Sequence, residues 1–280
     1  MPIISFYSKE KRETAKTFSL VSVATYMALM NNMRILVIST QFMDKSLENA
    51  FWPNTGLGNI STLGLDKNTD ISTGIEGLSK AVMSNKSTPE IITNYTRVVF
   101  KDRLEILVSP ETENKIEYNK MAAVYKEIIQ FANKYYDIVL VDLSSDFENE
   151  SQIKDILDIS NLCIYTMSQA QSSINSVIDI KNKMKPEELN RTMFLMGKYD
   201  AFSKYNEKNI SRMIGERKGV LTVPYATILN EAANEGQIAE YFIKFNKLTD
   251  ATDSNYLCIQ AIKRDVEMII YKLQELQMQY

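Results

Sequence analysis

Short apolar runs rich in β-forming residues alternate along this chain with longer segments of helical periodicity, and this alternation constrains the fold most. Some short runs are apolar without interruption, as at 138–141, which is typical of strands covered on both faces. We expect strands at 3–7, 34–40, 104–109, 138–143, 162–167, 192–196 and 220–223. We expect helices at 16–31, 74–83, 115–134, 151–159, 172–184, 206–217, 229–245 and 255–279. The pattern predicts an α/β fold with a mainly parallel, twisted sheet and helices on both faces.

The chain has no internal repeat and no linker of low complexity, so we expect a single domain over 1–280 that ends in the helix 255–279. The segment 51–70 holds Trp52, Pro53 and three of the nine glycines, which favours a long loop. Such loops gather beyond the carboxyl ends of the strands, where open α/β sheets bind ligands. No apolar run is long enough to cross a bilayer, and we expect a cytoplasmic protein.

The composition excludes several kinds of chemistry. The chain of 280 residues contains no histidine, which removes histidine bases, serine–histidine and cysteine–histidine nucleophile pairs, and histidine-ligated metals. Its two cysteines, Cys163 and Cys258, are too few for a Cys₄ metal site or a disulfide framework.

The most informative segment runs from the first strand into the first helix. A strand, a short loop and Lys16-Thr17 at the start of a helix form a layout that holds phosphates on backbone N–H groups, with the lysine on the phosphates and the threonine on Mg²⁺. The loop nevertheless has Arg12, Glu13 and Ala15 where glycines make the required positive φ angles inexpensive. By itself, the segment also fits a polar connection whose lysine and threonine are merely solvated.

Six segments, in the same order along nearly the whole chain, resemble the ParA/MinD family of deviant P-loop ATPases. They are 11–17, 35–41, 136–142, 158–165, 197–200, and 223–225 together with 234–236. The first keeps both lysines and the threonine of the family's Lys-Gly-Gly-x-Gly-Lys-Thr loop, and the third is similar to its Tyr-Asp-hydrophobic-Asp strand. The resemblance implies a three-layer P-loop NTPase-like fold, with ATP and Mg²⁺ as ligands.

The resemblance also implies roles for individual residues. Lys16 would bind the β- and γ-phosphates, while Thr17 and Asp142 would hold Mg²⁺. Lys11 matches the signature lysine, which in the family reaches the nucleotide of the second subunit, so a homodimer is expected. The other expected nucleotide contacts are Thr14, Ala15, Phe18 and Pro224.

Three losses relative to the family's pattern point to a degenerate site, and the missing loop glycines at Arg12, Glu13 and Ala15 are the first. Ser39 and Gln41 replace carboxylates that arrange Mg²⁺ and the attacking water, although Gln41 can still position a water. Gly197 stands where many members have an asparagine that recognises adenine. We therefore expect slow or absent hydrolysis.

Three functions remain open. The first is an atypical ParA/MinD-like positioning or assembly factor, favoured for a Flp/Tad-type pilus or secretion system (TadZ/CpaE-like), whose machinery would be its partner and which could be recruited to the cell pole or the inner face of the membrane. The second is an ATP-dependent partition ATPase for plasmid or other mobile DNA. The third is a structural scaffold that binds no nucleotide.

Two further features bear on partners. The segment 181–218 has ten Lys and Arg residues against five Asp and Glu, so nonspecific DNA binding competes with a solvated helix pair as its explanation. The last helix has a heptad-like apolar seam that we expect to pack on the body of the domain or on a partner helix. The seam consists of Ile262, Val266, Ile269, Leu273 and Leu276.

Overall fold

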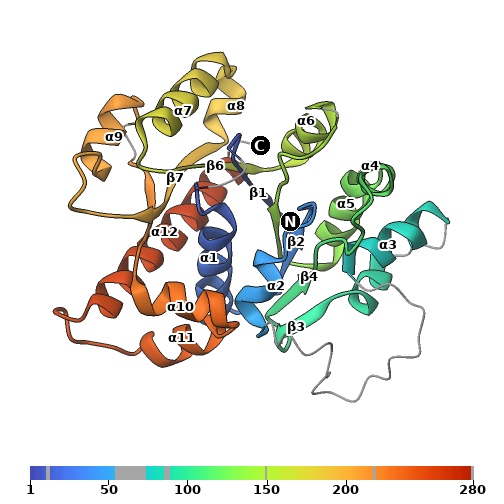
Figure 1. The fold of residues 1–280 in the computed structure, drawn as a ribbon, viewed down its shortest axis with the longest axis horizontal. Coiled ribbons are helices and arrows are strands. Elements are labelled where there is room, and N and C mark those ends of the chain that lie inside the picture. The colour runs from blue at the N-terminus through green and yellow to red at the C-terminus, as the bar shows by residue number, and fades with distance from the viewer. Residues whose placement is uncertain (11–12, 54–73, 85–88, 149, 217–218, 279–280) are drawn as a thin grey trace.

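The computed structural model describes residues 1–10, 13–53, 74–84, 89–148, 150–216 and 219–278. Within this part of the chain, eight strands form one sheet in the order β3-β4-β2-β5-β1-β6-β7-β8, and all neighbours are parallel except β3 and β4 (Figure 1). The strands are β1 (Ile3–Tyr7), β2 (Ile35–Ser39), β3 (Arg97–Phe100), β4 (Leu104–Leu107), β5 (Ile138–Asp142), β6 (Leu162–Met167), β7 (Thr192–Tyr199) and β8 (Leu221–Pro224). The predicted α/β class with a mainly parallel sheet is confirmed.

Helices cover both faces of this sheet (Figure 1). One face of the sheet is covered by α1, α2, α10, α11 and α12. The remaining helices cover the opposite face. The helices are α1 (Lys16–Met30), α2 (Ser46–Phe51), α3 (Gly74–Met83), η1 (Pro89–Asn94), α4 (Lys115–Ala122), α5 (Tyr125–Tyr135), α6 (Glu150–Ile159), α7 (Gln171–Lys183), α8 (Pro186–Asn190), α9 (Glu207–Met213), α10 (Thr227–Glu235), α11 (Ile238–Phe245) and α12 (Ser254–Gln277).

The core follows from the alternation of side chains along each strand. In β5, Ile138 and Leu140 face the α1 side, whereas Val139 and Val141 face the α5 side, and all four are buried. A strand buried on both faces needs an unbroken apolar run, which is the pattern seen in the sequence. The carboxyl ends of β1, β2 and β5 therefore meet at one edge of a rigid sheet.

The apolar seam of α12 is used inside the chain. Its five residues are all buried against the α1 face of the sheet, with Ile262 and Ile269 fully covered. The expected packing on the body of the domain is confirmed, while its use as a dimer interface is wrong because the domain itself covers the seam. Any homodimer must form through another surface.

Several elements differ from the sequence-based expectation. The edge strand β3 was not predicted, since it pairs only with β4 across a tight turn. The expected helix 229–245 is broken at Gly236, whose φ of 76° ends α10 in the left-handed region. The expected helix 115–134 is likewise broken at Ala123 and Val124. Most of the loop expected at 51–70 lies outside the described residues.

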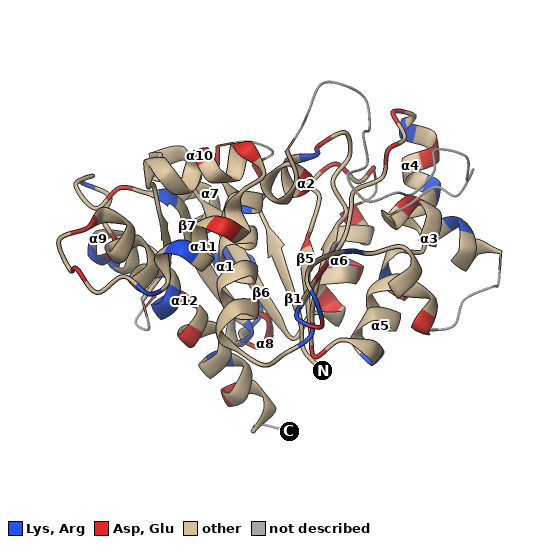
Figure 2. Cartoon of the chain, turned by 90° about the horizontal axis from the view of Figure 1, so that it is seen from below, with Lys and Arg blue, Asp and Glu red and all other residues tan. Residues whose placement is uncertain are grey.

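The basic segment 181–218 does not present all its cations to solvent. Lys181 donates to the carbonyls of Ile214 and Gly215, and Arg191 donates to those of Leu157 and Ser160. Blue and red positions are interspersed over the outer helices in Figure 2. Arg217 and Lys218 lie outside the described residues, and DNA binding stays a prediction.

The described residues contain neither a membrane-spanning helix nor a cluster of metal-ligating side chains. No helix there is both long enough and apolar enough to span a membrane. No group of three or more Asp, Glu or Cys side chains in that part of the chain is placed to hold a metal ion.

Candidate functional site

Two residues that carry a Cβ adopt positive φ angles just before α1 begins. Glu13 and Ala15 have φ angles of 74° and 51°, in the left-handed region that costs a residue with a Cβ about 1–2 kcal/mol. Ala15 is the N-cap of α1 and provides no side-chain cap, and the first turn of that helix contains no acidic residue of its own. The N–H groups at this helix end are therefore suited to an anion.

The strain in this loop can be measured. We expect Glu13→Gly and Ala15→Gly each to raise the free energy of unfolding by about 1 kcal/mol, because glycine adopts positive φ freely. Ala81→Gly, inside α3, is the matched control and should lower it by about the same amount. Urea unfolding tests all three variants, and a destabilised Ala15→Gly would contradict the assigned loop conformation.

Asp142, the last residue of β5, is the centre of the site. Its carboxylate is fully buried and accepts hydrogen bonds at both oxygens. Lys16 Nζ lies 2.9 Å from Oδ1, and Thr17 Oγ1 donates to Oδ2 over 2.8 Å. Gln41 Nε2 also donates to Oδ1, at 3.1 Å, and Lys16 Nζ reaches the carbonyl of Leu143 as well. The predicted convergence of Lys16, Thr17 and Asp142 is confirmed.

A second set of bonds fixes the backbone beneath this carboxylate. Thr40, just after β2, donates from its N–H and its hydroxyl to the carbonyl of Asp142, and its hydroxyl accepts the N–H of Ser144. Tyr118 of α4 donates its hydroxyl to the carbonyl of Thr40 over 2.7 Å. Burial raises the pKa of Tyr118 above its usual range, so this donor keeps its proton. The ends of β2 and β5 are thereby held in one position.

A cavity of about 420 Å³ opens beside these residues. Its volume is within the range of roughly 300–1,000 Å³ that is common for small-molecule sites. Among the described residues, its lining carries Glu10, Glu13 and Asp44 against Lys16 and Lys198. The remaining lining residues are Thr14, Ala15, Thr17, Phe18, Val21, Gln41, Ser46, Ala50, Asn230, Ala233 and Asn234. The site thus combines a basic helix terminus with an acidic rim and an amide-bearing wall from α10.

Gly197 of β7 lies against the loop and leaves no space for a side chain. A Cβ placed there would lie 2.3 Å from the carbonyl oxygen of Thr14 and 2.9 Å from the Cβ of Ala15. The glycine therefore serves the packing of the loop on the sheet, and no side chain at 197 can reach into the cavity without displacing that loop.

The structure brings most, though not all, of the predicted site residues together. Thr14, Ala15, Phe18 and Gln41 line the cavity with Lys16 and Thr17, whereas Pro224 at the end of β8 is not part of the lining. Lys11 lies outside the described residues. Sequence reasoning assigned Lys198 and Asn230 no role in this cavity, because only the fold brings β7 and α10 next to the loop.

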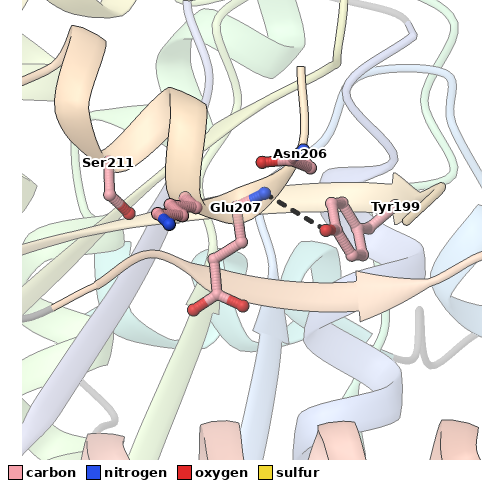
Figure 3. A pocket seen from close by; sticks show the side chains of 5 residues that line it. Tyr199, Asn206, Glu207 and Ser211 are labelled. Carbon is pink, nitrogen blue, oxygen red and sulfur yellow. Dashed lines mark hydrogen bonds between the residues drawn. The ribbon is translucent and has the colours of Figure 1, made fainter. Parts of the chain in front are cut away.

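A second hollow, of about 400 Å³, lies at the end of β7 beside α9 (Figure 3). Tyr199, Asn206, Glu207 and Ser211 line it, and the hydroxyl of Tyr199 accepts the backbone N–H of Glu207 over 3.1 Å. It contains neither Lys16 nor Asp142, and we regard it as a surface depression whose hydrogen bond anchors the end of β7.

Comparison with solved structures agrees with this geometry. A ParA family ATPase from Chlorobium tepidum superposes with a TM-score of 0.66 and 14% sequence identity, covering 95% of this chain and 97% of its own. The septum site-determining protein MinD of Pyrococcus horikoshii, complexed with Mg-ADP, gives 0.66 and 16%, covering 96% and 95%. This chain has the fold of the ParA and MinD ATPases.

A more distant match belongs to the same fold. A protein of Borrelia burgdorferi described as a plasmid partition protein, bound to AMPPNP, gives a TM-score of 0.55 at 14% identity over 99% of this chain and 98% of its own. No protein-family model and no curated protein matches the sequence. The likeness thus lies in the backbone, and the roles of individual residues rest on the geometry described above.

Proposed function

We propose that this chain binds a Mg²⁺-nucleotide in the cavity at the start of α1 and hydrolyses ATP slowly or not at all. The observation that carries the proposal is the convergence of Lys16 and Thr17 on the buried Asp142 beside a loop with left-handed residues at 13 and 15. Of two proteins with the same fold, one was solved with Mg-ADP and the other with AMPPNP, which supports the choice of a nucleotide as ligand.

The residues present fit such a ligand. Lys16 and the uncapped N–H groups of α1 would hold the phosphates, and Thr17 and Asp142 supply the oxygen ligands that Mg²⁺ prefers. A bound Mg²⁺ would offset the negative charge of the phosphates. In this structure Lys16 forms an ion pair with Asp142, so binding of the Mg²⁺-nucleotide requires this ion pair to be replaced by contacts with the ligand.

Two features argue for weak turnover. Phosphoryl transfer depends on positioning the attacking water and on stabilising charge. Gln41 carries no charge, and its amide group already donates a hydrogen bond to the carboxylate of Asp142. Glu10, Glu13 and Asp44 place negative charge around the cavity, which opposes the charge of a triphosphate.

Isothermal titration with Mg-ADP and Mg-ATP tests the proposal directly. We expect saturable binding to the parent chain and none to Lys16→Ala, since the variant lacks the cation at the phosphate site. A steady-state assay should give ATP turnover well below about 1 s⁻¹, the lower end for ordinary enzymes. Circular dichroism of Lys16→Ala establishes that it is folded.

The proposal has two parts, nucleotide binding and slow or absent hydrolysis, and a different result would contradict each. Rapid ATP turnover that is lost in Lys16→Ala would show a competent ATPase. Absence of binding by either nucleotide, with no rise in the thermal midpoint, would favour the scaffold without a ligand, because a ligand that binds only the native state must raise the midpoint.

We place the biological role with intracellular positioning or assembly factors, and within them with the localisation factors of Flp/Tad-type pilus or secretion systems. The support for the narrower choice is the eroded phosphate loop and the sequence around Gly197–Asp200 and Pro224-Tyr225. The alternative is a DNA partition ATPase. Retention of nonspecific DNA that requires ATP and falls steeply with salt separates the two, since phosphate contacts release counterions.

A further inference from the structure

The strand β7 departs from regular pairing just before it ends beside the cavity. Its register with β8 shifts between Met196 and Tyr199, and within this interval Lys198 has a φ of 50°. Irregularities of this kind turn a side chain away from the direction it would take in a regular strand. Lys198 is exposed, and it lines the cavity that contains Lys16.

Both neighbours of Lys198 are held firmly. Gly197 packs against the carbonyl of Thr14 and the Cβ of Ala15. On the other side, the carbonyl of Tyr199 accepts the N–H of Tyr225 at 3.0 Å, and its hydroxyl accepts the N–H of Glu207 (Figure 3). The left-handed conformation of Lys198 is therefore imposed by its surroundings, at a position where glycine would be favoured.

The charge of Lys198 is available to a ligand. In the described part of the chain, Lys16 is ion-paired with Asp142, whereas no ion pair involves Lys198. Its ammonium lies 5.9 Å from the ring centroid of Phe18, in the first turn of α1. A contact of this length with an aromatic face is weak, and the lysine stem can redirect the charge toward an anion at the helix terminus.

We propose that Lys198 binds a phosphate group of the nucleotide and supplies the positive charge that Lys16 shares with Asp142. The proposal rests on the proposed function, because it requires a nucleotide in this cavity. It explains why a lysine occupies a left-handed position on a bulge beside the phosphate loop, where a glycine would be more stable.

The decisive variant is Lys198→Gly, which removes the charge and relieves the backbone. We expect its thermal midpoint to rise by about 2–4 °C. Its Kd for Mg-ADP, measured by titration calorimetry, should increase at least about tenfold through the loss of one charged contact. The matched control is Asp102→Gly, which relieves a φ of 59° in the β3–β4 turn at the other end of the sheet. It should raise the midpoint and leave the Kd within about twofold.

A second comparison isolates the charge. Lys198→Arg should bind Mg-ADP nearly as tightly as the parent. Raising the NaCl concentration should reduce the Mg-ADP affinity of the parent more than that of Lys198→Gly, because salt screens an exposed charge. If Lys198 had a purely structural role, the parent, Lys198→Arg and Lys198→Gly would bind Mg-ADP with the same affinity and the same salt dependence.

The outcomes distinguish this proposal from the proposed function. If the parent binds Mg-ADP, Lys16→Ala does not, and Lys198→Gly binds like the parent, the role of Lys198 is refuted while nucleotide binding stands. If the parent fails to bind Mg-ADP and Mg-ATP, both fall. A lower midpoint for Lys198→Gly would show that this side chain supports the fold, and would also overturn the proposal.

Discussion

Asp142→Ala should lower the free energy of unfolding by about 3–5 kcal/mol, the usual cost of removing one partner from a buried ion pair. Asp142 is fully buried and the side chain of Lys16 is only 11% exposed, so the variant leaves an ammonium with little access to water. Thr17 loses its acceptor at the same time, and Gln41 keeps only the backbone carbonyl of residue 142. Urea unfolding followed by circular dichroism gives the measurement.

A double-mutant cycle with Lys16→Met separates the ion pair from general packing. In the Lys16→Met background, Asp142→Ala should cost at least about 1 kcal/mol less than in the parent, since no cation is left without its partner. Equal costs in both backgrounds, or a loss below about 1 kcal/mol in the parent, would show that the Lys16–Asp142 pair contributes little to the folded state.

Gly197→Asn is expected to destabilise the chain by about 2–3 kcal/mol through overpacking. The resemblance to ParA/MinD proteins places an adenine-recognising asparagine at this position, so the substitution looks at first like a repair of the site. The Cβ alone would lie 2.3 Å from the carbonyl oxygen of Thr14, and the loop must move to admit it. We expect a lower thermal midpoint and no gain in Mg-ADP affinity.

Gly215→Ala provides the matched control for this prediction. Gly215 has a φ of 66°, but the position of its Cβ is open. Gly215→Ala should therefore lower the free energy of unfolding by about 1 kcal/mol through backbone strain alone. The loss at Gly197 should exceed it, because Gly197 needs space and not a positive φ. A Gly197→Asn variant as stable as the parent would mean that β7 and the loop before α1 are not in contact.

The core of the fold was accessible from sequence because its signal is local. The run 138–141 predicts a central strand buried on both faces, and β5 lies between β1 and β2. The position of Lys16 and Thr17 was also predictable, since a strand followed by a short loop puts them at the start of a helix. The edge strand β3 was missed because it is only four residues long, and its residues, exposed or half-buried throughout, do not alternate between a buried and an exposed face.

The candidate site was predictable only in part. Lys16, Thr17 and Asp142 could be brought together by the rule that parallel strands end at one edge of the sheet. The contribution of β7 and α10 could not, since Gly197 is 183 residues from Thr14 in the chain and touches its carbonyl only in the folded state.

The sequence by itself determined the α/β class and the buried strands, because both depend on the periodicity of adjacent residues. Its resemblance to the ParA/MinD loop and strand motifs singled out the lysine, threonine and aspartate of the candidate site. Only the tertiary structure decided that the α12 seam is covered by its own domain, that Gly197 has no space for an asparagine, and that Lys198 turns into the cavity from a bulge. These three depend on contacts between segments far apart in the chain, and no local pattern of residue types records them.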